Sequence, residues 1–433
     1  MQAELARAEA VRAAMPEGGM FAAKDWLAAP EPFALSEKFV DELEKLGYRL
    51  HLFVRACNLL YQQSIKGRQP AWVADYLDRG KPPELLEASR AKALRDEIPR
   101  VIRPDIILTE NGFVLSELDN VPGGIGLTGW LGETYAAHGF DVVGGAAGMA
   151  DGFRAILPGG AKILVSEEAA TYRPEMEWLA TRLGAGYGVE RAEDFDPATS
   201  SSVFRFFELF DLPNLPSSAA LMQASAEGRA TVTPPFKPQL EEKMWFALFW
   251  SHPLRDFWRR ELSERHWLKL REVIPQTWIM DPAPLPHFGV IPGLEIQDWN
   301  ELSDFTHKQR EIIVKISGFH EKAWGARGVV LGSDVSHNDW RGTVSSALEA
   351  FPAHPYIAQR FMKGRLVQQR YVDPQTGELR TMQGRVRLCP YYFVSGGKTQ
   401  LGGVLSTVCP ADKKLLHGMK DAIISPCHVV RES

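Results

Sequence analysis

The chain is poor in the features that mark secreted, membrane and metal-thiolate proteins. Its 433 residues include only four cysteines, none in a CxxC pair, and this usage is typical of reduced thiols. No apolar run approaches the roughly 20 residues that a membrane helix needs. The alanine-rich start of the sequence also lacks the apolar core of a signal peptide. We therefore expect a cytoplasmic protein that makes no membrane contact.

A surplus of positive charge is also absent. The 49 Lys and Arg residues are outnumbered by 54 Asp and Glu residues, and the net charge is −5. This balance excludes an extended nucleic-acid-binding surface, so any anion site must be a local cluster. No Ser–His or Cys–His arrangement indicates a covalent nucleophile, and the histidines show no metal-ligand spacing. The length and the hydrophobic content of 45% predict a globular protein of two or three domains.

The apolar pattern changes twice along the chain. Residues 1–100 are predicted to be mainly helical, with Ser36 capping a helix whose apolar positions recur at helical spacing. Residues 101–200 begin with a hairpin and then alternate strands with helices, which predicts a small parallel α/β layer. Residues 201–433 alternate strands with glycine-rich loops. We expect these three segments to be the domains.

The hairpin at the start of the second segment carries an unusual set of polar residues. A two-residue NG loop would turn its polar pairs to opposite faces, whereas a three-residue ENG loop would place Asp105 opposite Glu117 and Arg103 opposite Asp119. The second register gathers one cation and three carboxylates on one face, so we choose it. The other face is then apolar and contains Ile102, Ile106, Leu108, Val114 and Leu118.

The gathered carboxylates predict a metal site. Carboxylates this close repel one another unless a dication or an arginine lies among them. Magnesium prefers one or two carboxylates plus phosphate oxygens, and Glu117 with Asp119 or Asn120 suits that preference. The turn PGGIG follows directly and would let backbone approach a ligand closely. The alternative is a solvated edge strand, where Pro104 would be tolerated.

A second candidate site lies in the last segment. Lys315 is embedded in the apolar strand IIVKI and is followed by the glycine-rich loop SGFHEKAWGARG, which contains Gly318. The lysine and the loop's N–H groups suit phosphates, although an edge-strand lysine is the plainer alternative. In YIAQRF, Gln359 interrupts another apolar strand, where backbone amides could bind the edge of a purine. Arginines among aromatic residues suit carboxylates or phosphates, or else stack on the rings; they are Arg205, Arg385 and Arg387.

The order of these motifs resembles that of eukaryotic-type glutathione synthetases, glutathionylspermidine-synthase-like proteins and other circularly permuted ATP-grasp ligases. The resemblance covers roughly residues 100 to 425, and its motifs are R-x-D, E-x-(N/D), a glycine-rich turn, two lysines and a hinge strand. It implies a mixed α+β / α/β fold: a permuted ATP-grasp region at 201–433, a Rossmann-like substrate domain at 101–200 and a helical N-terminal region at 1–100. It also implies ATP and Mg²⁺ as cofactors.

Site residues follow from the resemblance by position in the motifs. The carboxylate substrate would be oriented by Arg103, Arg205, Arg385 and Arg387. Phosphates and adenine would be bound by Lys243, Lys315, Gly318, Gln359, Arg360 and Phe361. Magnesium would be bound by Glu117, Asp119, Asn120 and Glu321. Where the family has a glycine triplet and a glutamate after the second lysine, this chain has SGFHEKAWGARG, and Lys269 is an alternative to Lys243 as the first lysine.

The resemblance implies an ADP-forming ligase that joins a small carboxylic acid to an amine through an acyl phosphate. The amine or acid would be an amino acid, a peptide or a polyamine, and a homodimer is left open. Two alternatives keep the nucleotide site. One is a phosphotransferase that acts on another acceptor, and the other is a nucleotide-binding protein of the same fold without turnover.

Overall fold

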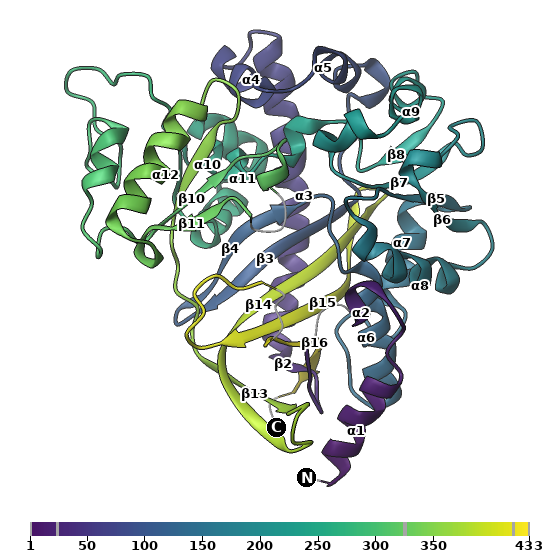
Figure 1. The fold of residues 1–433 in the computed structure, drawn as a ribbon. Coiled ribbons are helices and arrows are strands. Elements are labelled where there is room, and N and C mark those ends of the chain that lie inside the picture. Colours follow the sequence, from purple (N-terminus) through teal and green to yellow (C-terminus); the bar gives the residue numbers. More distant parts are fainter. Residues whose placement is uncertain (1, 23–25, 324–326, 418–420, 432–433) are drawn as a thin grey trace. The chain divides into compact units, whose positions relative to one another are not determined.

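The structure is a computed structural model that describes residues 2–22, 26–323, 327–417 and 421–431 (Figure 1). The chain forms two compact units, each built from separate segments. The first unit comprises Met1–Leu52, Ala88–Phe236 and Lys363–Ser433, and the second comprises Phe53–Glu87 and Lys237–Met362. The division into domains at 1–100, 101–200 and 201–433 stays a prediction. No helix in the described part is both long and apolar enough to cross a membrane.

An eight-stranded sheet forms the centre of the first unit. Its order is β1-β16-β15-β14-β3-β4, with β13 on β14 and β2 on β16, and all pairs are antiparallel except the parallel pairs of β1 and β2 with β16. The long strands β14 and β15 lie side by side and β3 adjoins β14 (Figure 1). The strands are β1 (Leu27–Ala28), β2 (Phe33–Ser36), β3 (Val101–Thr109), β4 (Gly112–Asp119), β13 (Val367–Val372), β14 (Leu379–Ser395), β15 (Lys398–Pro410) and β16 (Ile423–Val430).

A second, four-stranded sheet of the first unit is parallel throughout, as the alternation of strands and helices predicted. Its order is β6-β5-β7-β8, and helix α8 (Arg173–Leu183) connects β5 to β6. Gly184 ends α8 with a φ of 87°, as its position after the apolar pattern predicted. The strands are β5 (Ala161–Val165), β6 (Tyr187–Arg191), β7 (Ser202–Phe206) and β8 (Thr231–Thr233), and α9 (Ser218–Ala226) lies between β7 and β8 in the chain.

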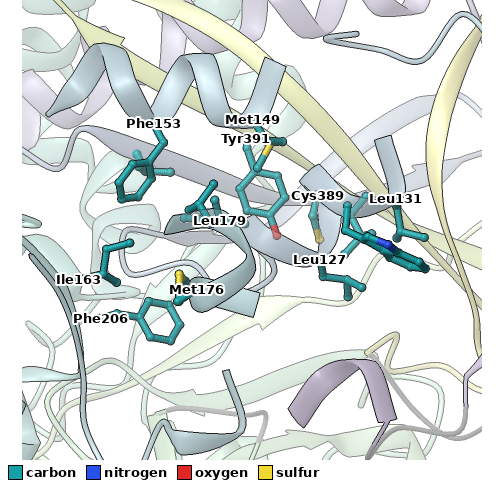
Figure 2. Packing of buried hydrophobic residues seen from close by; sticks show 14 of the residues in the cluster. Leu127, Leu131, Met149, Phe153, Ile163, Met176, Leu179, Phe206, Cys389 and Tyr391 are labelled. Carbon is teal, nitrogen blue, oxygen red and sulfur yellow. The ribbon is translucent and has the colours of Figure 1, made fainter. Parts of the chain in front are cut away.

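The main core of the first unit joins its two sheets. Helices α6 (Ile125–Ala137), α7 (Gly148–Ile156) and α8 place apolar side chains against residues of β5, β7 and β14 (Figure 2). Leu127, Met149 and Met176 come from the three helices and are all buried. At roughly 25 cal/mol per Å² of buried apolar area, such a cluster is the dominant stabilising term of the unit. The sheet edge that carries the hairpin is thereby fixed relative to α6.

The second unit contains a four-stranded antiparallel sheet, β11-β10-β12-β9, with α12 (His337–Ala350) packed on one face. The packed face includes Ile312, Val314 and Ala358, whereas Ile313, Lys315 and Gln359 alternate to the other face. Its strands are β9 (Thr277–Ile279), β10 (Ile312–Ile316), β11 (Val329–Leu331) and β12 (Tyr356–Arg360), and its other helices are α4 (Ala71–Asp78), α5 (Pro83–Ser89), α10 (Met244–Trp250) and α11 (Arg255–Val273).

The N-terminal region is helical, but not throughout. Helices α1 (Gln2–Ala13), α2 (Gly19–Ala22) and α3 (Glu37–Ile65) are present, and Ser36 Oγ accepts a hydrogen bond from the Phe39 N–H at 3.3 Å, as predicted. The structure adds β1 and β2, which pair with the distant strand β16. β1 has only two residues and β2 only four, and their partners in β16 lie about 390 positions away, so local sequence gives little indication of either strand.

Candidate functional site

The register of the hairpin brings its polar residues together as expected. Arg103 lies opposite Asp119 and Asp105 lies opposite Glu117. The loop, however, differs from the three-residue prediction, because Thr109 pairs directly with Gly112. A bulge at Ser116 restores the predicted pairing beyond it.

The bulge also corrects one residue of the predicted apolar face. Val114 pairs with Ile107 and so lies on the same face as the polar residues, whereas Leu115 takes its place opposite Ile106. Leu115 is fully buried, which agrees with this exchange. Alternation alone could not reveal the shift, because a bulge changes the parity of every residue on one side of it.

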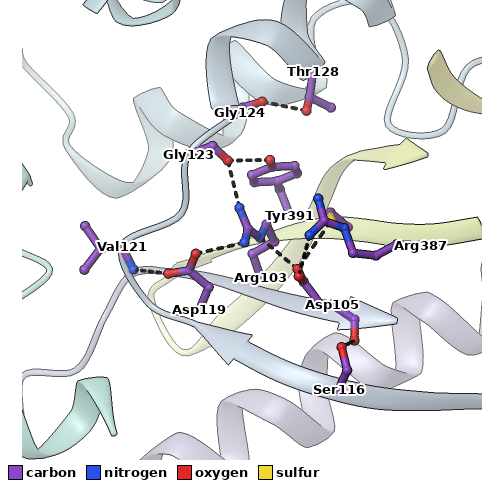
Figure 3. Close-up of polar contacts among 11 residues, drawn as sticks. Arg103, Asp105, Ser116, Asp119, Val121, Gly123, Gly124, Thr128, Arg387 and Tyr391 are labelled. Atoms are coloured by element: carbon purple, nitrogen blue, oxygen red, sulfur yellow. Dashed lines mark hydrogen bonds and ion pairs between the residues drawn. The ribbon is translucent and has the colours of Figure 1, made fainter. Parts of the chain in front are cut away.

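Two arginines and two aspartates form the arginine–aspartate cluster: Arg103, Asp105, Asp119 and Arg387 (Figure 3). Arg103 lies between the two carboxylates, with its Nη2 2.8 Å from Asp119 Oδ2 and its Nε 3.3 Å from Asp105 Oδ1. Arg387, on the neighbouring strand β14, donates to Asp105 Oδ2 at 3.0 Å. The arginine side chains are 15% and 18% exposed, so these charges interact in a largely dehydrated place.

The cluster keeps donor capacity of its own. The Nε–H groups of Arg103 and Arg387 are buried and form no well-aligned hydrogen bond to a described residue, although Arg103 Nε lies 3.3 Å from Asp105 Oδ1. Buried donors are satisfied in most proteins, so two such groups side by side on one sheet face are unusual. A guanidinium fork is also the side chain best suited to a carboxylate. Both guanidinium groups are nevertheless already paired with Asp105 or Asp119.

Burial and charge shift the pKa values of the cluster in opposite directions. Burial raises the pKa of Asp119, Glu117 raises it further, and Arg103 only partly lowers it. The pKa of Arg103 is held above its ordinary value because Asp105 and Asp119 outweigh its burial. Burial, and then Asp105, raises the pKa of the adjacent Cys389 to about 12, so that thiol stays protonated. Arg103 thus does not fully offset the effects of burial and of Glu117 on the pKa of Asp119.

Two carboxylates of the hairpin are the protein groups that could contribute ligands to magnesium. Glu117 and Asp119 are half-buried carboxylates, and burial is the main cause of the raised pKa of Asp119. Asp119 uses Oδ2 for Arg103 and Oδ1 for the Val121 N–H at 2.8 Å, which leaves further lone pairs on both oxygens. Asn120 is buried beside them in the chain. Within the described part, no three His, Cys, Asp or Glu side chains gather closely enough to form a metal centre by themselves.

The N–H groups of the glycine-rich turn after β4 are hydrogen-bonded by a side chain of the protein. Glu175 of α8, which is fully buried, accepts hydrogen bonds from the Gly124 N–H at 2.7 Å and from the Leu127 N–H at 2.8 Å. These are the open N–H groups at the start of α6, so Glu175 occupies the place where a helix binds anions. Gly124 has a φ of 86°, and a Cβ there would lie 2.5 Å from the Tyr391 hydroxyl oxygen.

Tyr391 ties the turn to the cluster. Its hydroxyl donates to the Gly123 carbonyl oxygen at 2.7 Å, and Arg103 Nη1 donates to the same oxygen at 3.0 Å (Figure 3). Sequence reasoning missed Tyr391 and Glu175. A tyrosine in an aromatic strand and a glutamate in an amphipathic helix carry no local signal, because their partners lie tens to hundreds of residues away.

Two of the arginines predicted for the site are bound by backbone carbonyl oxygens outside the arginine–aspartate cluster. Arg205 is fully buried, and its guanidinium donates to the carbonyl oxygens of Pro234, Pro235 and Phe207. Arg385 is also buried and donates to the Gly364 carbonyl oxygen at 2.9 Å and to other backbone carbonyls. Buried guanidinium groups need such acceptors, and these arginines obtain them from the backbone. Only Arg103 and Arg387 of the four lie in the cluster.

In the second unit, the two lysine-bearing segments meet at Ser317. The Lys243 N–H donates to the Ser317 carbonyl oxygen at 2.8 Å, and Lys243 Nζ donates to the Ala323 carbonyl oxygen at 2.8 Å. Lys315 is two residues before Ser317 on β10 and is only 4% exposed. Lys269, the alternative first lysine, lies on the exposed surface of α11 and pairs with Glu272. Lys243 therefore contacts the segment that follows Lys315, whereas Lys269 lies on the surface of another helix.

The other residues predicted to bind nucleotide or metal in this unit lie in β12 or directly after β10 and β12. Gly318 follows Ser317, and a Cβ on it would lie 2.8 Å from the Glu242 Cδ, so packing alone requires glycine there. Gln359 is buried and its Nε2 donates to Thr277 Oγ1 at 3.2 Å. The N–H groups of Arg360 and Phe361 donate to backbone carbonyls of Gln276 and Glu311. A purine would have to use other groups of this segment. Glu321 is exposed at the start of a short 3₁₀ helix, Glu321–Ala323.

Comparison with known proteins identifies the fold. No protein-family model and no curated protein matches the sequence. Among solved structures, a glutathione synthetase like-effector from Globodera pallida in its apo form matches with a TM-score of 0.58 and 9% identity, over 99% of this chain and 97% of that chain. The chain has a glutathione synthetase-like fold. A putative gamma-glutamylcysteine synthetase from Methylobacillus flagellatus KT is also similar, with a TM-score of 0.40 and 12% identity over 87% and 85% of the two chains.

Proposed function

We propose that the chain is an ATP- and Mg²⁺-dependent, ADP-forming ligase that joins a carboxylic acid to an amine. The observation that carries the proposal is the meeting of two lysine-bearing segments at Ser317, with Lys243 and Lys315 within two residues of the contact. Phosphoryl transfer depends on positioning and charge neutralisation more than on a covalent nucleophile. The glutathione synthetase-like fold supports this chemistry at the level of architecture only.

The residues have distinct roles in this mechanism. Lys243 and Lys315 neutralise the phosphates of ATP. Glu117 and Asp119, with Asn120, would hold magnesium, which supplies further charge neutralisation at the phosphate oxygens. The adenine is assigned to the segment 359–361, through groups that are not already bonded to Gln276, Thr277 or Glu311.

The arginine–aspartate cluster is assigned to the acid substrate. Arg103 and Arg387 orient its carboxylate, one oxygen of which attacks the γ-phosphorus while ADP leaves. The amine then attacks the carbonyl carbon of the acyl phosphate, loses a proton and displaces phosphate. Because Asp105 and Asp119 hold both guanidinium groups, the arginines are fixed before the substrate arrives.

One observation favours a second candidate, a nucleotide-binding protein of the same fold without ligase activity. The cluster is largely paired within itself, and the N-terminus of α6 is already bound by Glu175. A substrate carboxylate would have to compete with these internal carboxylates. Such a protein would bind nucleotide but consume none.

A screen of acids and amines for ADP release distinguishes the two candidates. Amino acids, short peptides and polyamines are mixed pairwise with Mg²⁺ and ATP, and ADP and free phosphate are measured together. The ligase releases both in equal amounts only when an acid and an amine are present. A phosphorylated product without free phosphate would indicate a phosphotransferase, and nucleotide binding without ADP release from any mixture would favour the inactive protein.

A further inference from the structure

A buried ion pair lies beside the two lysine-bearing segments. Lys81, in the connection between α4 and α5, contacts Glu242, with 2.5 Å between Nζ and Oε1. The two side chains are only 1% and 3% exposed. Lys81 is a single lysine between two helices with no motif around it, so the sequence alone assigns it no chemical role.

Glu242 connects this pair to both segments at once. It directly precedes Lys243, and its Oε2 accepts a hydrogen bond from the Ser317 hydroxyl at the end of β10. The same hydroxyl oxygen accepts the Met244 N–H at 2.9 Å. The Glu242 carboxylate also packs against Gly318, where no side chain would fit. One carboxylate thus fixes the start of α10, the end of β10 and Gly318, the first glycine of the glycine-rich loop.

The connection that carries Lys81 is also held in place by contacts with the segment after α12. Arg79 donates to the Phe351 carbonyl oxygen at 3.0 Å, and a Cβ on Gly80 would lie 2.3 Å from the Ala353 carbonyl oxygen, so this connection packs closely on the segment after α12. Lys81 Nζ lies 5.7 Å from the ring centre of Phe319, which has a φ of 45°. A positive φ is costly for a non-glycine residue and persists where the surroundings hold it.

A role in stability alone does not account for the pair. Replacing a buried ion pair by well-packed apolar residues is often neutral or stabilising, because both charges must be dehydrated. Its polar contacts, in contrast, are directional and join three segments. We propose that Lys81 and Glu242 are positioning residues for nucleotide binding, which hold Lys243, Lys315 and the loop at Gly318 in one arrangement. The inference rests on the proposed function.

The decisive variant replaces the pair by an apolar one, Lys81→Met with Glu242→Leu. Its melting temperature should remain within about 5 °C of the wild type, because no unpaired charge is left behind. Its Kd for a non-hydrolysable ATP analogue with Mg²⁺, measured by calorimetric titration, should rise at least about tenfold. Lys81→Arg, which keeps the charge, should bind more tightly than Lys81→Met.

The control is a double variant of an exposed ion pair in the same unit, Arg259→Met with Glu264→Leu, whose side chains are 40% and 51% exposed. It should bind the analogue within about twofold of the wild type, since exposed pairs contribute little. A Kd for the Lys81/Glu242 variant that is also within about twofold would overturn the inference while leaving the proposed function intact. Failure of the wild type to bind the analogue would overturn both.

A second variant covers the case in which the double variant does not fold. Ser317→Ala keeps the ion pair and removes the hydroxyl that connects Glu242 to β10. Its Kd for the analogue should rise at least about threefold, the effect of losing a hydrogen bond of about 0.7 kcal/mol. An unchanged Kd would overturn the inference.

Discussion

The Lys315→Met variant should lose most of the thermal stabilisation that Mg²⁺ and ATP give the wild-type chain. At about 100 times Kd, a ligand adds about 2.7 kcal/mol to the free energy of unfolding. Lys315 lies within β10 and is 4% exposed, so its ammonium would meet a phosphate with little water between them. Loss of such a charge-assisted contact raises Kd by about 10- to 150-fold, which reduces the stabilisation at the same ATP concentration to well under half in most of that range.

Methionine is chosen because it keeps the unbranched length of lysine without its charge, and Lys243→Met should have a similar effect. Lys269→Met is the matched control, since Lys269 pairs with Glu272 on the exposed surface of α11. Scanning calorimetry with and without Mg²⁺ and ATP measures the shifts. A melting-temperature shift of wild-type size in Lys315→Met would remove Lys315 from the site. A lost shift in Lys269→Met would make Lys269, and not Lys243, the first ATP lysine.

The Arg103→Met variant should be less stable than the wild type by about 3 kcal/mol, at the low end of the range for breaking a buried ion pair. Arg103 contacts both Asp105 and Asp119, so its removal takes away the arginine that pairs with Asp119 and leaves Arg387 to pair with Asp105. Denaturant unfolding near neutral pH measures the loss. The control Arg154→Met, in an exposed pair with Asp151, should change stability by less than about 0.5 kcal/mol.

The pH dependence of this loss follows from the raised pKa of Asp119. A carboxyl group whose pKa is higher in the folded state costs stability once it ionises, and without Arg103 this pKa rises further. The deficit of Arg103→Met should therefore be largest near neutral pH and decrease as the pH falls through the raised pKa of Asp119. A deficit that grows on acidification would contradict the assignment of charge to the cluster.

Local sequence patterns predicted those structural features whose interactions are formed by neighbouring parts of the chain. The cap at Ser36, the end of α8 at Gly184 and the pairing of Arg103 with Asp119 depend on residues close in sequence, and the parallel sheet follows from the alternation of strands and helices along the chain. The bulge at Ser116 was missed, because the hydrophobic pattern does not record an extra residue in one strand. The strands β1 and β2 were missed because a distant strand forms them.

Partners far away in the chain also limited what the sequence could predict about the candidate site. Arg103 and Arg387 meet in one cluster, but the sequence could not distinguish them from Arg205 and Arg385, which look equally suitable and are bound by backbone carbonyls. Which arginine is bound internally depends on long-range packing. The same holds for Glu175 and Lys81, whose partners are 48 or more positions away.

The central claim, that ATP activates a carboxylic acid, is tested most directly by isotope transfer. An acid labelled with ¹⁸O in its carboxylate, of the kind found in the substrate screen, is incubated with Mg²⁺, ATP and the amine, and the released phosphate is analysed by mass spectrometry. An acyl phosphate requires that one labelled oxygen move from the acid to each phosphate. Phosphate that carries no label would contradict the proposed mechanism.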